Sequence, residues 1–343
     1  MKSAITSLNR ELRAVWMLLF VCVVLFIATP LFLTGDNLLN VLLATSVTAL
    51  LAAGQTYVII LAEIDLSVGA ILGISSIVTA FVLRDQPLVV GLLAGWGVGA
   101  VAGLVNGLLV TKLRMPSFIA TLAMMSVLAG LTLQFSQGNP VSIDNGGFID
   151  IGQSRVLGVP TPVWIMLASF VVFGVLLARS RFGRHVYAVG DNADAARLAG
   201  INVHRVKILA FVISGVLSAT AGFILAARLG TAQPTAGTGL ELAAIAAVII
   251  GGTSLAGGRG ALAGTLIGAL LLGVIDNGLN LLDVSPFLQG VVKGLVILIA
   301  IFLDRNSDRV RALARLVRPP RGPGSGTHAS TATTSPTTTG GTP

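Results

Sequence analysis

Long apolar stretches make up most of this chain, and charged residues gather in the short breaks between them. A helix of roughly 20 apolar residues is long enough to cross the hydrocarbon core of a bilayer. The pattern therefore predicts an all-α polytopic membrane protein with about ten transmembrane helices. The segment 240–256 is short enough to end inside the membrane. The predicted segments are roughly 14–34, 38–61, 66–83, 88–111, 117–136, 161–179, 207–229, 240–256, 260–282 and 287–303.

The two ends of the chain differ from its apolar middle. Residues 1–13 are predicted to form a cytoplasmic N-terminal segment and 14–303 the transmembrane domain. The first apolar run is long for a signal peptide and lacks a clean Ala-x-Ala cleavage site, so we interpret it as a retained span. The remainder, 304–343, is predicted to be cytoplasmic. Its basic part, 304–318, either lies on anionic lipid or is simply solvated, and the Pro-, Gly-, Ser- and Thr-rich tail is predicted to be disordered.

Charge is scarce but strongly biased towards Lys and Arg. Only 10% of the residues are charged, yet the net charge is +8. With the N-terminus in the cytoplasm, 18 of the 22 Lys and Arg residues fall on the cytoplasmic side and three on the other. This asymmetry predicts a multi-pass protein of the plasma (inner) membrane with both termini in the cytoplasm. The basic excess is thus explained by anchoring at the membrane lipid, and no nucleic-acid partner is expected.

Two glycine-rich segments, 91–109 and 260–279, resemble each other. In the predicted topology they cross the membrane in opposite directions, so the match indicates an inverted-topology repeat, which is typical of transporters that enclose a pathway between two halves. Chance similarity between Gly- and Ala-rich helices is the alternative. The matched residues are Gly91, Ala94, Gly95 and Gly99 with Gly260, Ala263, Gly264 and Gly268, and Asn106-Gly107 with Asn277-Gly278.

Two carboxylates precede the third apolar segment, in the stretch AEIDLSVGAILG at 62–73. Glu63 and Asp65 can form an acid–base pair or a proton relay. Alternatively, both lie at the cytoplasmic interface, where Asp65 or Ser67 caps the following helix and interacts favourably with its dipole.

Further polar side chains fall in or near the predicted spans, where they are costly unless they face a cavity or a partner helix. They either line a path for a polar solute or form hydrogen bonds between helices. Lys293 has apolar neighbours on both sides and needs a partner, for which Asp276 and Glu241 are candidates. The candidates for the path are Asn106, Asp276, Asn277 and Asn280.

One polar passage, GRHVYAVGDNADAARLAGINVHR at 183–205, interrupts the apolar pattern on the cytoplasmic side. Asp191 or Asn192 is a good N-cap for a helix over 193–199. Gly200 suits a left-handed C-cap. A helix of about two turns is too short to be stable alone. It either docks on another protein or belongs to an ordinary connecting loop, and its small apolar face consists of Ala195, Leu198 and Ala199.

This passage closely resembles the cytoplasmic loop of ABC-importer permeases of the ribose/xylose/arabinose type. EIDLSVGAILGISS is similar to that family's loop after the second span. ELAAIAAVIIGGTSLAGGRGALAGTLIGALLLGVIDNGLNLL and FLQGVVKGLVILIAIFLD are similar to its C-terminal half. The likeness covers about residues 38–304, with several long motifs in the same order. It implies a permease that translocates a monosaccharide or a similar small polar solute and is not itself an enzyme.

The resemblance also implies partners. A second permease copy or a paralogue would complete the membrane part, and an ABC ATPase subunit with paired nucleotide sites would bind ATP and Mg. An extracytoplasmic solute-binding protein would deliver the solute, and the polar outer loop 137–160 either meets that protein or is a simple connector. Within the coupling loop 180–206, the helix at 192–199 would seat in a groove of the ATPase. The residues thereby assigned to ATPase coupling are Asp191, Asn192, Ala195, Ala196, Arg197, Leu198 and Gly200.

Three places depart from the family's pattern. Ala62 and Glu63 stand where a pair of glycines is usual, and Asp191 stands where a small residue is usual. Ala243 stands where Asp is frequent. The two acidic replacements add negative charge near the expected ATPase face, where they would adjust the choice of partner.

The chain carries no G-x-x-x-x-G-K-[ST] motif, so ATP must be handled by another subunit and no cofactor is expected here. The single cysteine, Cys22, allows neither an internal disulfide nor a cysteine-based metal site. No nucleophile–base pair stands out, which argues against an intramembrane enzyme. The alternative function is an ion-coupled secondary transporter that uses Glu63, Asp65 or Asp276.

Overall fold

The computed structural model describes residues 2–285, 287–292, 294–295 and 298. The chain divides into two units, 1–304 and 305–343, and every described residue belongs to the first. The predicted tail beyond 303 and Lys293 therefore lie outside the described residues. Eight of the 17 residues of the tenth predicted segment lie outside them as well, and the residues described there, between 287 and 298, are helical.

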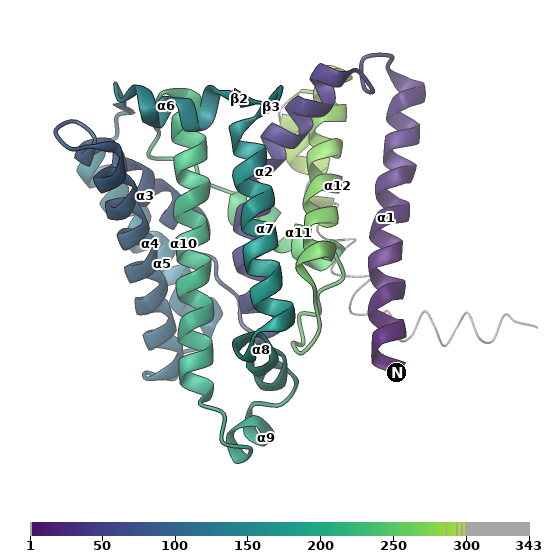
Figure 1. Cartoon of the computed structure of the whole chain (residues 1–343), viewed down its shortest axis with the longest axis vertical. Helices are drawn as coiled ribbons and strands as arrows, with labels where there is room; N and C mark the ends of the chain where they lie inside the picture. Colours follow the sequence, from purple (N-terminus) through teal and green to yellow (C-terminus); the bar gives the residue numbers. More distant parts are fainter. Residues whose placement is uncertain (1, 286, 293, 296–297, 299–343) are drawn as a thin grey trace, which may run out of the picture. The chain divides into compact units, whose positions relative to one another are not determined.

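The described chain is helical apart from short two-residue strands (Figure 1). Strand β1 pairs antiparallel with β4, and β2 pairs antiparallel with β3. The elements are α1 (Lys2–Ala28), α2 (Gly35–Ile60), α3 (Val68–Val82), α4 (Leu88–Thr111), α5 (Ser117–Ser136), β1 (Val141–Ser142), α6 (Gly146–Gln153), β2 (Arg155–Val156), β3 (Val159–Pro160), α7 (Thr161–Arg179), α8 (Arg181–Asp191), α9 (Ala193–Leu198), α10 (Val203–Leu229), β4 (Thr231–Ala232), α11 (Leu240–Ile250) and α12 (Leu262–Leu281).

Each of the first nine predicted segments coincides with a helix, which confirms the all-α polytopic class. Among the described residues, six helices are long and apolar enough to cross a membrane: α2, α4, α5, α7, α10 and α12. Helices α3 and α11 have only 15 and 11 residues. The predicted span 240–256 is therefore too long, because α11 ends at Ile250 and is followed by Gly251-Gly252. Two apolar segments thus give half-length helices.

Helices α2 and α10 form the centre of the bundle. Helix α2 contacts α7, α10, α11 and α12, whereas α10 contacts α2, α3, α4 and α6. The buried residues of α2 run almost without interruption from Thr45 to Ile60, and include polar Gln55 and Thr56. The outward faces of α5 and α7 instead carry large exposed apolar side chains, such as Phe135 and Val172. A surface of this kind is suited to lipid, in which apolar side chains need no cover.

The helix contacts repeat when α2 is exchanged with α10, α3 with α11, and α4 with α12. The α4–α10 contact then corresponds to α12–α2, the α3–α10 contact to α11–α2, and the α3–α4 contact to α11–α12. The glycine register proposed from the sequence is not reproduced, however. Gly99 lies against Gly215 of α10, whereas its matched residue Gly268 lies against Ala247 of α11 and Gly251 directly after that helix. The repeat is thus seen in which helices contact each other, whereas the aligned glycines contact different neighbours.

The long contact between α4 and α10 depends on small residues. A Cβ on Gly99, Gly103 or Gly107 would run into the backbone of α10 at Gly215, Phe211 or Ile208. These glycines recur every four residues and so share one face of α4, where they let the two backbones approach closely. In lipid such close packing drives helix association, because there is no gain from hiding apolar surface from water.

Replacing Gly103 by Val should destabilise the bundle, because the new Cβ would overlap the carbonyl oxygen of Phe211, which is backbone and cannot move aside. Overpacking of this kind typically costs about 1–3 kcal/mol, which thermal unfolding of the detergent-solubilised protein would detect. Gly97→Val on the same helix is the matched control, since nothing lies within 4 Å of its Cβ position. An equal loss in both variants would contradict the packing argument.

Candidate functional site

The predicted polar helix is present as α9. The Oδ1 atom of Asn192 accepts hydrogen bonds from the backbone N–H groups of Asp194 and Ala195 at 3.0 and 2.9 Å, so Asn192 is the N-cap. At the other end, Gly200 takes a left-handed φ of +82°. Both caps are those that the sequence predicts, and together they end a helix of six residues. Figure 1 shows α9 at the same end of the molecule as the start of α1, with α6, β2 and β3 at the opposite end.

The side chains of α9 divide into an anchor and an exposed face. Ala196 is only 5% exposed and packs into the protein's own core, so it positions α9 and cannot contact another protein. Leu198 is 91% exposed, and Ala195 and Ala199 are exposed beside it. Arg197 forms a surface ion pair with Asp194 at 3.2 Å, which contributes little to stability in water. The apolar face predicted from the sequence therefore projects into solvent without cover from the described residues.

Helix α8 is a part of this region that the sequence interpretation missed. Its N-cap is Ser180, whose Oγ accepts the Gly183 N–H at 2.9 Å. Phe182 stacks on the ring of Tyr57, with centroids 6.1 Å apart. The signal was available, because small and apolar residues recur at helical spacing and all of them are buried. They are Gly183, Val186, Val189 and Gly190.

The end of α8 is held between two loops that come from opposite halves of the chain. A Cβ on Gly190 would overlap the carbonyl oxygen of Ile60, at the start of the α2–α3 connection. That same oxygen accepts a hydrogen bond from the Gly258 N–H at 2.8 Å, in the α11–α12 connection. The Tyr187 hydroxyl donates to the Gly260 carbonyl at 2.7 Å. The end of α8, which leads directly into α9, therefore contacts both connections at once.

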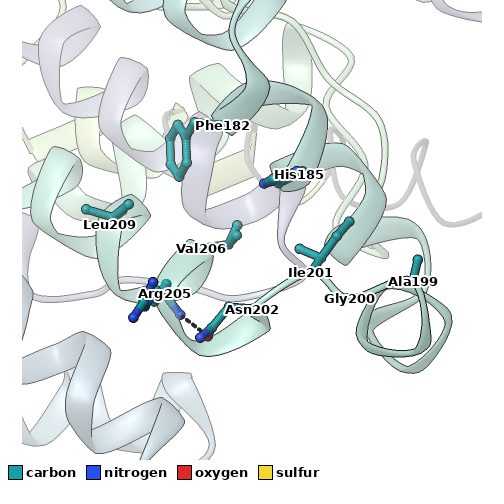
Figure 2. Close-up of a pocket in the computed structure, with 9 residues that line it drawn as sticks. All are labelled: Phe182, His185, Ala199, Gly200, Ile201, Asn202, Arg205, Val206 and Leu209. Atoms are coloured by element: carbon teal, nitrogen blue, oxygen red, sulfur yellow. Dashed lines mark hydrogen bonds between the residues drawn. The ribbon is translucent and has the colours of Figure 1, made fainter.

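A groove of ≈ 410 Å³ lies beside α9, between α8 and the first turns of α10 (Figure 2). It combines apolar side chains with basic ones, and Arg205 and Leu209 at its rim are exposed. The lining residues are Phe182, His185, Ala199, Gly200, Ile201, Asn202, Arg205, Val206 and Leu209. The groove is continuous with the exposed face of α9, since both include Ala199.

The α2–α3 connection contains Ala62 and Glu63, which stand where the resembled family usually has two glycines. Ala62 has a left-handed φ of +59°, a conformation that favours glycine, which is usual there in the family. Glu63 is paired with Lys207 of α10, and the side chains of both are largely buried. Glu63 thus ties the connection to α10, and its predicted effect on partner choice stays a prediction. Asp191 is exposed, so its predicted effect stays a prediction.

Asp65 is the centre of a buried polar cluster. Its Oδ1 accepts the N–H and the hydroxyl of Ser67 at 3.0 and 2.6 Å, and its Oδ2 accepts the Ser214 hydroxyl at 3.1 Å. Gln55 donates to the Asp65 carbonyl, and Asn106 donates to Ser67 Oγ at 2.8 Å. All five residues are fully buried. Asp65 therefore does not pair with Glu63, and it organises the start of α3 from inside the protein.

Three of the four predicted path residues lie together in a cavity that is distinct from the Asp65 cluster. Asp276, Asn277 and Asn280 line a cavity of ≈ 310 Å³ between α2, α10, α11 and α12, together with Arg228. Asn277 also exchanges two hydrogen bonds with Asn37, at 3.0 and 2.8 Å, so it serves in helix packing as well. The fourth residue, Asn106, is in the Asp65 cluster and does not line this cavity. In the described part of the chain, no three His, Cys, Asp or Glu residues gather as a metal site requires.

Comparison with known proteins identifies related chains. Residues 37–301 match the family model described as "Branched-chain amino acid transport system / permease component". The ribose import permease protein RbsC of Escherichia coli (strain K12) is 47% identical over 306 residues, which cover 87% of this chain and 94% of that protein. The ribose import permease protein of Bacillus subtilis (strain 168) is 50% identical over 294 residues, with 84% and 91% covered.

A third relative is the L-arabinose ABC transporter permease protein of Azospirillum brasilense. It is 39% identical over 289 residues, which cover 83% of this chain and 85% of that protein. No solved structure matches the chain significantly.

Asn192→Ala should loosen α9, because two backbone N–H groups lose their acceptor. Loss of an N-cap costs about 1 kcal/mol, which corresponds to roughly fivefold faster local opening. Hydrogen–deuterium exchange of residues 193–199 would measure this. Asn202→Ala, at the N-cap of α10, is the control and should leave α9 unchanged, whereas Asn192→Ser should restore protection. Unaltered exchange in Asn192→Ala would show that the cap does not hold the helix.

Proposed function

The chain belongs to the family of branched-chain amino acid transport system permease components, and from this premise we propose that it is the permease subunit of an ATP-driven ABC importer for a monosaccharide or a similar small polar solute. The proposal is carried by one observation above all. Helix α9, in the predicted coupling loop 180–206, presents an uncovered apolar face in solvent at the end of the bundle. An exposed leucine on a rigid, capped helix is suited to fill a pocket of another protein.

The solute class is supported by the relatives and by the cavity lined by Asp276 and Arg228. The related permeases are named for ribose and L-arabinose, although the family's description names amino acids. Amide, carboxylate and guanidinium groups line the cavity around Asp276 and Arg228. Such planar groups hydrogen-bond to neighbouring hydroxyls of a neutral polar solute. Sequence identity of 39–50% over most of the chain favours the sugar class.

Energy would come from a partner ATPase with paired nucleotide sites, which binds ATP and Mg. Closure of that ATPase on ATP would shift the docked α9, and α8 would carry the shift to the α2–α3 and α11–α12 connections, which it contacts at Ile60 and Gly260. The two halves would then rock and change the side from which the path is open. The residues proposed to face the ATPase are now Asp191, Ala195, Arg197, Leu198 and Ala199.

Orientation follows from the position of α9. If α9 meets a cytoplasmic ATPase, the start of α1 at the same end is cytoplasmic too, and α6 with β2 and β3 faces outward (Figure 1). An extracytoplasmic binding protein would dock at that outer end and deliver the solute. If each of the ten predicted segments crosses the membrane, both termini would lie in the cytoplasm, in agreement with the basic residues.

An inverted repeat is supported by the exchange of helix contacts described above, in which α2, α3 and α4 correspond to α10, α11 and α12. Half-length α3 and α11 are then equivalent elements, as discontinuous helices are in transporters built from inverted halves. A second copy or a paralogue would complete the membrane part beside them.

The function is tested by reconstituting the chain in proteoliposomes with its cognate ATPase and binding protein. Uptake of labelled ribose or arabinose should require ATP and all three components, and dissipation of proton and sodium gradients should not change it. Uptake that follows an ion gradient and ignores ATP would support the alternative, an ion-coupled secondary transporter that uses Asp276 or another carboxylate.

Leu198→Glu should weaken association with the ATPase about tenfold or more, because a buried interface hot spot contributes about 2 kcal/mol. Membrane insertion and thermal stability should not change, since Leu198 makes almost no contact within the chain. Pull-down of the ATPase measures the effect. Leu157→Glu is the matched control, being 89% exposed at the opposite end. Equal pull-down by both variants would remove α9 from the interface.

A further inference from the structure

Helix α11 begins inside the membrane. Its 11 residues rise about 16 Å, roughly half of the ~30 Å hydrocarbon core. Its last turn is fixed at the α9 end of the bundle, because Gly251 packs against the backbone of Gly264 and the following loop contacts α8 through Gly258. The first turn of α11 therefore lies about halfway across.

The connection that leads into α11 must enter from the opposite end. Helix α10 ends at Leu229, and β4 then pairs with β1 in the α5–α6 connection. Residues 233–239 form neither helix nor strand. Seven extended residues span at most about 23 Å, which is enough to reach the middle of the membrane from that end.

The tip of this connection meets the start of the other half-length helix. A Cβ on Gly237 would overlap the carbonyl oxygen of Gly69 in the first turn of α3, and the reverse also holds. One side of the connection is therefore packed against protein. Its other side is open, since Thr235, Thr238 and Gly239 are exposed. Glu241 is partly exposed, with one carboxylate oxygen lying over Gly69.

Such a surface cannot face lipid. Irregular backbone is tolerated at membrane depth only where protein covers it or where it lines a water-filled cavity. Among the described residues, no hydrogen bond or ion pair reaches the Glu241 carboxylate. An ionisable side chain left in this position requires water, a ligand or a partner. Exposed hydroxyls beside it add to the same requirement.

We propose that residues 233–241 line the water-filled solute path at mid-membrane, with the Glu241 carboxylate and the Thr238 hydroxyl as hydrogen-bonding groups for a neutral polyhydroxylated solute. The chemical class rests on the proposed function, whereas the location of the path rests on helix length and exposure alone. This places the path at the junction of α3 and α11. The cavity around Asp276 adjoins this junction, because Ala243 in the first turn of α11 is among its lining residues.

Single-cysteine scanning tests the location. In a Cys22→Ser background, which removes the only cysteine, Thr238→Cys is treated in open membrane fragments with the impermeant reagent sulfonatoethyl methanethiosulfonate. We expect labelling at least about tenfold faster than at Val172→Cys, because a thiol in hydrocarbon does not ionise to the reactive thiolate. Val172 is an exposed residue in the middle of α7 and serves as the matched lipid-facing control. Leu157→Cys, in an exposed turn, is the positive control.

The outcomes separate this inference from the proposed function, because labelling needs neither ATP nor the ATPase. Fast labelling at 238 in the fragments, together with loss of sugar uptake after the same variant is labelled in proteoliposomes, supports the path. Failure of the reagent to label 238, while membrane-permeant N-ethylmaleimide does so, overturns it even if uptake is ATP-driven. For Glu241→Gln we expect sugar uptake to fall at least about fivefold with the amount of assembled complex unchanged. Full uptake in that variant would remove Glu241 from the path.

Discussion

A backbone that leaves the helical conformation inside a membrane must find all its hydrogen-bond partners within the protein or in enclosed water. This constraint governs both half-length helices. On the α3 side it is met by the Asp65 cluster, in which side chains from α2, α4 and α10 satisfy the connection and its carboxylate. On the α11 side, contact with Gly69 covers only one face of the connection. This difference explains why the connection before α3 is buried, whereas the connection before α11 has exposed polar groups.

Glycine contacts determine how motion can travel through this fold. Where Gly190 meets Ile60 and Gly237 meets Gly69, backbone lies directly on backbone, with no side chain between them that could change rotamer and absorb a shift. The contacts that link α8 and α9 to the rest of the bundle are therefore rigid, because backbone packs directly on backbone. The Glu63–Lys207 ion pair adds a further tie between the α2–α3 connection and α10, at a position where the resembled family has glycine.

The parts of the fold that depend on local chemistry were predictable from the sequence. Apolar runs located the helices, and Asn192 and Gly200 located both ends of α9, because caps act through their own backbone. What failed depends on tertiary contacts. Hydropathy does not show that Ala196 packs inward, nor that Asn106 belongs to the Asp65 cluster and not to the cavity of Asp276.

Other predictions differ from the structure because the residue types in a segment do not determine which neighbours it contacts or where its helix ends. Aligning glycines placed Gly99 with Gly268, but glycine at four-residue spacing suits any close helix contact, so the match does not specify which neighbour is contacted. Helix α8 was missed because its charged residues hid a buried stripe ending at Gly190. The length of α11 was overestimated, since Gly251 and Gly252 continue an apolar stretch while ending the helix.

The anchoring of α9 separates its folding from its surface. Asn192, Ala196 and Gly200 hold the element in place, whereas Leu198 and its exposed neighbours contribute almost nothing to holding it. Substitutions on that outer face are therefore nearly neutral for folding, and under the proposed docking role selection on them would act through recognition alone. If α9 docks as proposed, duplicated copies of such a gene would diverge in their partner by changing a few surface residues, while the membrane-embedded part stays as it was.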